Sequence, residues 1–339
     1  MGGDLESTPL GCKSMRNNVY ILGAGFSANA NIPLTSSLLN EAINLIKEED
    51  RFIYDDLNYL VEAYYKIEST TIDYRFINLS ELLTILHYEE ISSYSSKNKT
   101  EIGKSKIISA LRYYLCKVIV RSTPKNNELP EFYNKFVKKL NPFDIVLSFN
   151  WDCLLEIALK NNGISFNHSF QFQDNIMVAK LHGSVNWTYT KEDNLNLEWK
   201  PIGLIEHSNE NEIYFSNDLW NIDKWQYSFS DSNLSPLIVM PGLGKSFDVL
   251  KLSCYWSNLS YSVGFAKQIF ILGLGLSADD FLLSKMLMSI LPPIPKDTEI
   301  IIVNPDPYIR SQYSFLVGDN KAKFICKKLS EDIFDLIKE

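Results

Sequence analysis

Short apolar runs recur along the chain, and each is followed by a polar or glycine-containing turn. These runs are Val19–Leu22, Ile145–Leu147, Met177–Leu181, Leu237–Met240, Gln268–Leu272, Glu299–Val303 and, more weakly, Lys323–Cys326. An apolar run without polar alternation is typical of a strand that is buried on both faces. Because helix-like patterns alternate with the runs, we expect an α/β fold, a doubly wound Rossmann-like parallel sheet of roughly six or seven strands.

Apolar residues at helical spacing follow several of these runs. The clearest predicted helices are Ser36–Lys47, Phe247–Val263, Asp279–Leu291 and Leu329–Lys338. The last of them begins with serine followed by two acidic residues, and acidic side chains are favourable at the N-terminus of a helix. We therefore expect helices to cover both faces of the sheet.

Two stretches interrupt this alternation and predict the domain organisation. Residues 51–140 show only helical spacing and are interpreted as a helical insertion with a polar loop at 92–106. Residues 186–235 are rich in Trp, Tyr, Asn and Asp and are interpreted as an irregular insertion near the strand ends. The Rossmann-like core would then comprise residues 1–50 and 141–339, with the second insertion included in it.

Composition and charge narrow the class of protein. A hydrophobic share of 45% in 339 residues is sufficient for a substantial core. Acidic residues outnumber basic residues by 41 to 33, and the net charge of −8 disfavours broad binding to nucleic acid. The first 18 residues lack the apolar run of a secretory signal, and Gln268–Leu283 is interrupted by Asp279 and Asp280. We expect a cytoplasmic protein that contacts neither membrane nor nucleic acid directly.

Cysteine spacing argues against a structural metal site. The five cysteines are scattered and include no CxxC pair, which is the arrangement that zinc ribbons use. We therefore expect no metal.

The first candidate site is the turn that follows the first apolar run, Gly23-Ala24-Gly25-Phe26-Ser27. A Gly-x-Gly turn between a buried strand and a helix can present backbone N–H groups and a helix N-terminus to a pyrophosphate. The usual third glycine is replaced by Ala28. The alternative is that Gly23 and Gly25 merely permit a tight turn.

Polar residues also follow two later apolar runs. Asn150 and Asp152 come after Ile145–Leu147, and His182 comes after Met177–Leu181. Ligands of open parallel sheets bind beyond the carboxyl ends of the strands, which is where these residues are expected. Asp152 has the alternative role of capping the next helix. Imidazole titrates near neutrality, which favours His182 as a general base.

Two late turns supply groups that suit a ribose or a phosphate. The residues are Gly273, Gly275 and Ser277 in one turn and Asn304 in the other. The segment Gly242–Ser246 ends in Gly-Lys-Ser but is not interpreted as a phosphate-binding P-loop. The first glycine of such a loop would fall at Val239, inside an expected strand. Lys245 is interpreted as a cation at the surface or at the edge of the site.

In this order, the motifs resemble the sirtuin-like superfamily, in particular the bacterial sirtuin-like domains of antiphage defence systems. The matching residues are Gly23-Ala24-Gly25-Phe26-Ser27 with Pro33, Asn150-Trp151-Asp152, His182-Gly183, Gly275-Leu276-Ser277 with Asp280, and Asn304. They extend from about residue 18 to residue 305. The zinc module with two CxxC pairs that protein-deacylating sirtuins carry is absent, and Pro33-Leu34-Thr35-Ser36 lacks their arginine.

The resemblance therefore implies hydrolysis of NAD⁺ to ADP-ribose and nicotinamide rather than deacylation. It implies that Asn150 orients the attacking water and a ribose hydroxyl, that His182 is the general base, and that Asp152 holds the nicotinamide amide. It further implies the following binding residues: Gly23, Ala24, Gly25 and Ser27 for the pyrophosphate; Gly273, Ser277 and Asn304, together with Gly275, on the adenosine side; and Phe26 over the nicotinamide ribose. The alternative for Phe26 is a place in the core.

The resemblance also implies control by assembly, because an uncontrolled NAD⁺ hydrolase would poison its own cell. We expect a homo-oligomer or a partner protein, such as an ATPase or an Argonaute-like subunit. Two other functions stay open at this point. One is a non-catalytic sensor that binds NAD or ADP-ribose in the same pocket. The other is an NAD-dependent oxidoreductase, for which the acid–base pair and the complete glycine fingerprint are missing.

Overall fold

The computed structural model describes most of the expected core. The described residues are 18–67, 72–95, 103–168, 175–190, 199–201, 212–216, 236–252, 256, 263–264, 266–276, 280–291, 294, 297–317 and 322–337. Ser277 and much of the tryptophan-rich stretch therefore lie outside the described residues.

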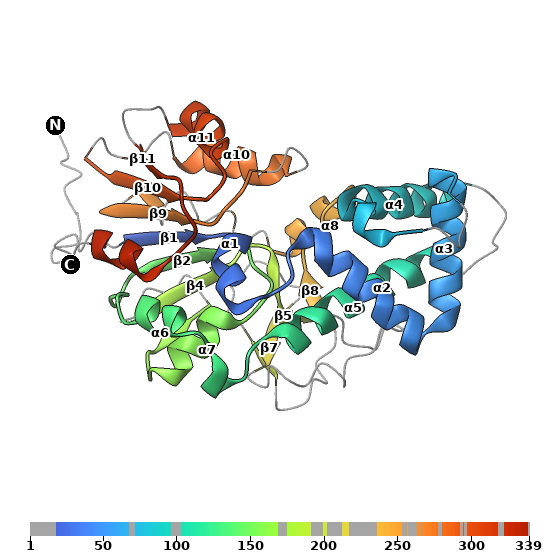
Figure 1. Cartoon of the computed structure of the whole chain (residues 1–339), viewed down its shortest axis with the longest axis horizontal. Coiled ribbons are helices and arrows are strands. Elements are labelled where there is room, and N and C mark those ends of the chain that lie inside the picture. The colour runs from blue at the N-terminus through green and yellow to red at the C-terminus, as the bar shows by residue number, and fades with distance from the viewer. Residues whose placement is uncertain are drawn as a thin grey trace, which may run out of the picture.

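A parallel sheet of seven strands forms the centre of the fold (Figure 1). Its strands are β1 (Asn18–Leu22), β2 (Ile145–Ser148), β3 (Phe166–Asn167), β4 (Ile176–Lys180), β9 (Gln268–Leu272), β10 (Glu299–Val303) and β11 (Ala322–Ile325). They lie in the order β11-β10-β9-β1-β2-β4-β3, and every pair is parallel. The predicted Rossmann-like α/β class is confirmed.

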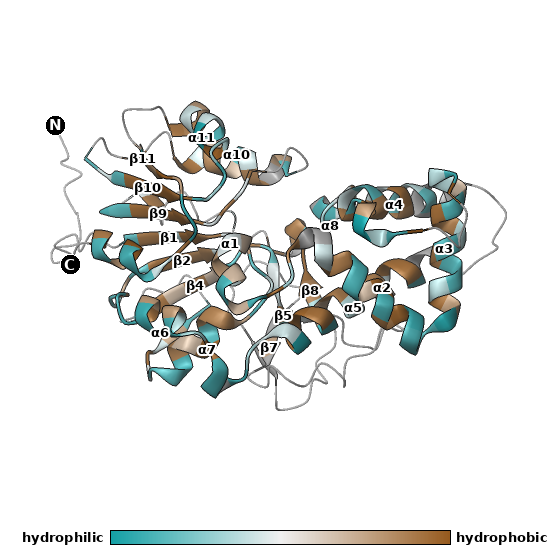
Figure 2. Ribbon diagram, viewed as in Figure 1, coloured by the Kyte–Doolittle hydropathy of each residue, from teal (hydrophilic) through white to brown (hydrophobic). Residues whose placement is uncertain are grey.

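Side chains of each central strand alternate between two apolar clusters, and both clusters are buried. In β1, Tyr20 and Leu22 enter one cluster, whereas Val19 and Ile21 enter the other. The first cluster includes α6 (Glu131–Val137) and α7 (Leu154–Asn161), and the second includes α10 (Phe281–Ile290) and α11 (Ile309–Val317). Figure 2 shows the strands as almost continuously hydrophobic. Burial on both faces explains why the strands appear in the sequence as uninterrupted apolar runs.

Four long helices form a separate helical unit beside the sheet: α2 (Thr35–Glu49), α3 (Arg51–Tyr65), α4 (Leu79–Ser95) and α5 (Gly103–Ser122) (Figure 1). α2 packs along α5 and also contacts α3 and α4. α6, which the sequence placed in the helical insertion, packs instead on α7 beneath the sheet. The helical unit therefore extends from α2 to α5, earlier at both ends than the expected range 51–140.

A small antiparallel sheet follows β4. It contains β5 (Gly183–Thr190), β6 (Trp199–Pro201), β7 (Glu212–Ser216) and β8 (Pro236–Ile238), in the order β6-β7-β5-β8. The described part of residues 186–235 is therefore regular, contrary to expectation. Leu237–Met240 was expected in the parallel sheet, but its first residues belong to β8, which pairs with β5. The place of the seventh parallel strand is taken by the two-residue β3.

Two predicted helices differ in extent. The first is Phe247–Val263. Among its described residues the only continuous helix is α8 (Lys245–Lys251), which begins two residues before the predicted start. The C-terminal helix is a short 3₁₀ segment, η6 (Glu331–Leu336), rather than an α-helix. Among the described residues, no helix is long and apolar enough to cross a membrane.

Candidate functional site

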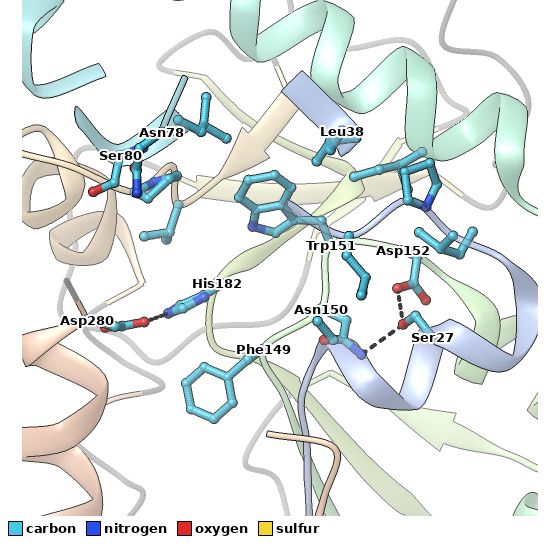
Figure 3. Close-up of a pocket in the computed structure, with 18 of the residues that line it drawn as sticks. Ser27, Leu38, Asn78, Ser80, Phe149, Asn150, Trp151, Asp152, His182 and Asp280 are labelled. Atoms are coloured by element: carbon cyan, nitrogen blue, oxygen red, sulfur yellow. Dashed lines mark hydrogen bonds and ion pairs between the residues drawn. The ribbon is translucent and has the colours of Figure 1, made fainter. Parts of the chain in front are cut away.

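A cavity of about 620 Å³ opens at the carboxyl edge of the parallel sheet (Figure 3). The strands that follow β1 in the sequence first extend the sheet on the β2 side, and from β9 onward they extend it on the opposite side. The strand order therefore reverses beside β1. In doubly wound sheets, ligands bind outside the carboxyl ends of the strands at this point. The turns after β1, β2 and β4 line one side of the cavity, and residues of α2 and the segment before α4 line the other. The cavity thus lies between the sheet and the helical unit.

Three of the predicted site residues form a continuous hydrogen-bond chain (Figure 3). Asn150 Nδ2 donates to Gly23 O at 2.8 Å and to Ser27 Oγ at 2.9 Å. Ser27 Oγ in turn donates to Asp152 Oδ2 at 2.6 Å. All three side chains belong to buried residues that line the cavity. Because both bonds of Asn150 use its nitrogen, its side-chain oxygen is not engaged in them.

Asp152 makes the helix-capping contact that its position predicted, and it also lines the cavity. Its Oδ1 accepts from the backbone N of Leu154 at 3.1 Å, at the start of α7, and its Oδ2 belongs to the chain described above. Burial raises the pKa of Asp152, while Lys180 and the bond from Ser27 oppose that rise. Lys180 is fully buried behind the site, donates to the backbone O of Asp152 and pairs with Glu156 at 3.4 Å. The bond from Lys180 therefore fixes the backbone of the Asn150–Asp152 turn.

His182 lies across the cavity from this chain. Its side chain is 12% exposed, and its Nε2 is 3.9 Å from Asp280 Oδ2. The ring of Phe149 meets it edge-on at 4.9 Å, and Trp256 lies roughly parallel at 6.4 Å. Burial, helped by the charge of Lys245 and opposed by Asp280, lowers the pKa of His182 to about 3. The imidazole is therefore neutral at pH 7 and is a weaker base than its ordinary value near neutrality suggested.

Lys245 and Asp280 complete this wall of the cavity. Lys245 Nζ lies 2.6 Å from Asp280 Oδ1. The same oxygen accepts from the backbone N of Leu283 at 2.9 Å, so that Asp280 also caps α10. The sequence predicted Lys245 to be a cation at the surface or at the edge of the site, and its side chain lines the cavity. The ion pair joins turns that are 35 positions apart, which spacing along the chain does not reveal.

Gly23, Gly25 and Gly273 bring two turns into direct contact. Gly23 N donates to Leu272 O at 3.0 Å, and Gly25 N donates to Gly273 O at 2.9 Å. A Cβ on Gly23 would lie 2.4 Å from Leu274 Cα, and Gly273 has a φ of 64°. These two amides are thus used within the protein. Within the turn, Ala24 and Ser27 line the cavity.

Phe26 lies in the core and not over the cavity. It is 2% exposed and packs against three aromatic rings of α6, those of Phe132, Tyr133 and Phe136. Tyr133 also donates to Phe26 O at 2.9 Å. The packing corresponds to the alternative of a core aromatic.

Residues expected on the adenosine side lie along the same edge but outside the set that lines the cavity. Asn304 Nδ2 donates to Leu274 O at 3.3 Å, and its Oδ1 accepts from Asp306 N at 2.9 Å. Gly275 is exposed, with open space where a Cβ would be. Ser277 lies outside the described residues.

Neither a protein-family model nor a curated protein matches the chain. In the part of the chain that the structure describes, no group of three or more His, Cys, Asp or Glu side chains could hold a metal ion.

Proposed function

We propose that the cavity binds NAD⁺ and hydrolyses it to ADP-ribose and nicotinamide. The observation that carries the proposal is the chain Asn150–Ser27–Asp152 facing His182 across one cavity at the switch point of the sheet. The volume of the cavity, about 620 Å³, lies within the range of pockets that enclose small molecules and cofactors. The same residues, in the same order, carry the resemblance to sirtuin-like NAD⁺ hydrolases.

The reaction breaks the bond between C1′ of the ribose and the pyridinium nitrogen. The bonding electrons pass to the nitrogen and leave nicotinamide neutral, so the leaving group needs no acid. Water then forms a bond to C1′ and releases a proton. The protein's task is to hold the ribose, limit the access of other water and place one water molecule.

In this proposal Asn150 positions the attacking water or a ribose hydroxyl. Its amide plane is fixed by two bonds through the nitrogen, which leaves the side-chain oxygen as the acceptor. Asp152, held by Ser27, contacts the carboxamide of nicotinamide. His182, which is neutral, accepts a hydrogen bond from a ribose hydroxyl or from the water.

The direct test is to incubate the purified protein with NAD⁺ and measure nicotinamide by chromatography. Asn150→Ala should lower the rate at least a hundredfold, because the group that positions the reactants is lost. It also removes two buried hydrogen bonds and should lower the melting temperature, so the rate is measured well below that temperature on protein shown to be folded. Asn162→Ala is a matched control, because Asn162 follows α7 and does not line the cavity. Near-normal turnover by a folded Asn150→Ala protein would show that the catalytic assignment is wrong.

A non-catalytic sensor of NAD⁺ or ADP-ribose is the second candidate. One observation favours it: burial and Lys245 keep the pKa of His182 near 3, which makes the imidazole a poor proton acceptor. A sensor would bind both nucleotides without releasing nicotinamide. Calorimetric titration with ADP-ribose, run beside the nicotinamide assay, separates the two functions.

The biological role that we propose is depletion of NAD⁺ in bacterial antiphage defence, with activity controlled by assembly. The support is the resemblance and the toxicity of an uncontrolled hydrolase. Specific activity should then rise with protein concentration or on addition of a partner. Full activity of the isolated monomer at nanomolar concentration would contradict control by assembly.

A further inference from the structure

Lys245 places a buried ammonium group in the wall of the cavity. It is the first residue of α8, and its side chain is 10% exposed. An ammonium group has three N–H donors, and one bond to Asp280 Oδ1 uses one of them. Because the side chain lines the cavity, further donors are available to a ligand there.

The turn that carries Lys245 is fixed against the helical unit. Gly242 has a φ of 94°, and a Cβ on it would lie 2.7 Å from Ser80 O. A Cβ on Gly244 would lie 2.2 Å from His87 Nε2. Leu243 N donates to Thr84 Oγ1 at 3.1 Å. These contacts with α4 leave the turn little freedom, so the start of α8 is held in place.

Two further ties fix the helix and the ammonium group. Asp248, on the first turn of α8, pairs with Arg112 of α5 at 2.9 Å. Asp280, the partner of Lys245, is itself held by its bond from Leu283 N. The cation is therefore anchored from both α8 and α10 and cannot swing freely into solvent.

Other candidate groups for an anionic ligand are already engaged or uncharged. The amides of Gly23 and Gly25 bond to the neighbouring turn. Arg75 also lines the cavity, but its side chain is 69% exposed, and its Nε and Nη2 donate to the carboxylate of Asp73. His182 is neutral at pH 7, because burial and the charge of Lys245 lower its pKa to about 3. Of the described side chains that line the cavity, Lys245 is thus the buried cation.

Burying a charged phosphate group requires a charged or hydrogen-bonding partner. We propose that Lys245 contacts the pyrophosphate of the bound dinucleotide and determines that the cavity takes phosphate-bearing ligands. This inference rests on the proposed function, since it concerns the same cavity. It moves the pyrophosphate contact from the glycine turn to a side chain on α8, and Asp280 acts as the positioning residue for that side chain.

The test is to titrate ADP-ribose into the wild type, Lys245→Met and Lys245→Arg at two salt concentrations. Losing a charge-assisted hydrogen bond should weaken binding by Lys245→Met about tenfold to a hundredfold, and Lys245→Arg should retain most of the affinity. Because salt screens charge, the wild-type affinity should fall with salt more steeply than that of Lys245→Met. A merely structural role would not alter the salt dependence. Lys139→Met, at an exposed position after α6, should match the wild type.

Unchanged affinity of a folded Lys245→Met protein would overturn the inference, and so would weaker binding with unchanged salt dependence. If Lys245→Met does not fold, the pair Lys245→Gln with Asp280→Asn keeps a hydrogen bond without the charges, and the same two outcomes apply. A wild type that binds ADP-ribose but releases no nicotinamide at any protein concentration, including concentrations that favour assembly, would refute hydrolysis and leave the assignment of Lys245 standing. A wild type that binds neither ADP-ribose nor NAD⁺ would refute both.

Discussion

At the scale of single residues, Ser27 links the turn after β1 to Asn150 and Asp152 in the turn after β2. Its hydroxyl donates to Asp152 and accepts from Asn150, and the residue is 3% exposed. Removing it leaves a buried carboxylate and a buried amide each without one partner. An unsatisfied buried polar group costs about 1 to 3 kcal/mol, and more when it is charged.

Ser27→Ala should therefore lower the free energy of unfolding by about 1 to 3 kcal/mol and also reduce nicotinamide release. Chemical denaturation and the NAD⁺ assay measure the two effects. Ser289→Ala is the control: Ser289 is exposed on α10 and bonds only locally to Met286 O, so stability and activity should stay near those of the wild type. Wild-type stability of Ser27→Ala would show that the hydrogen-bond chain contributes nothing.

His182 gives a prediction about pH. Its folded-state pKa of about 3 lies below the ordinary 6.5, so the unfolded chain binds a proton that the folded protein does not. Stability from this group is complete above about pH 6.5 and is lost as the pH falls towards 3. Between pH 7.5 and pH 5 the loss should be about 2 kcal/mol.

The measurement is the free energy of unfolding of wild type and His182→Gln at both pH values. The variant lacks the titrating ring, so its loss of stability on acidification should be smaller by about 2 kcal/mol. The comparison cancels the contributions of other groups, including buried His168, whose pKa is also lowered by burial. Parallel pH profiles for the two proteins would show that His182 titrates normally.

Residues at strand ends could be predicted from the sequence, whereas side-chain partners could not. Asn150, Asp152 and His182 follow apolar runs, and parallel strands bring their carboxyl ends to one edge. The pKa of His182 depends on burial by Phe149 and on the charge of Lys245, which arrive from other parts of the chain. Such contacts exist only after folding.

At the scale of elements, the contact between the β1 and β9 turns depends on glycine. Gly23→Ala would place a Cβ 2.4 Å from the backbone of Leu274, which no side-chain rotation can relieve. We expect this variant to lose several kcal/mol of stability, about as much as severe overpacking costs. Gly264→Ala meets nothing within 4 Å and should be neutral. The measurement is the melting temperature of both variants and of the wild type. A melting temperature of Gly23→Ala equal to that of the wild type would contradict the close contact of the two turns.

Element types were predictable where burial alone determines the pattern. The runs that became β1, β2, β4, β9 and β10 are apolar except at one end of each strand, because both sheet faces are covered. The run at Leu237–Met240 has the same pattern, yet β8 pairs with β5 in the small antiparallel sheet. The apolar content of a run indicates that the run is buried, but it does not indicate which strand the run pairs with. The two-residue β3 is too short to show a hydrophobic pattern.

At the scale of the whole molecule, the cavity has walls from two parts of the fold. Phe149, Asn150 and Trp151 come from the sheet edge, whereas Asn78 and Ser80 come from the start of α4 in the helical unit (Figure 3). A ligand that fills the cavity must contact both walls at once. Binding should therefore stabilise the contact between the sheet and the helical unit, in addition to the residues that the ligand touches.

Hydrogen exchange with and without saturating ADP-ribose tests this expectation. Exchange should slow together in the peptides that contain residues 77–84 and 149–154, because a bound ligand suppresses the opening of both walls. α11 and β11 lie away from the cavity and should exchange at the same rate in both samples. Protection of the 149–154 peptide alone would mean that the ligand binds at the sheet edge without engaging the helical unit. Uniform protection of the whole chain would instead indicate global stabilisation and would contradict a preferential effect on the two walls.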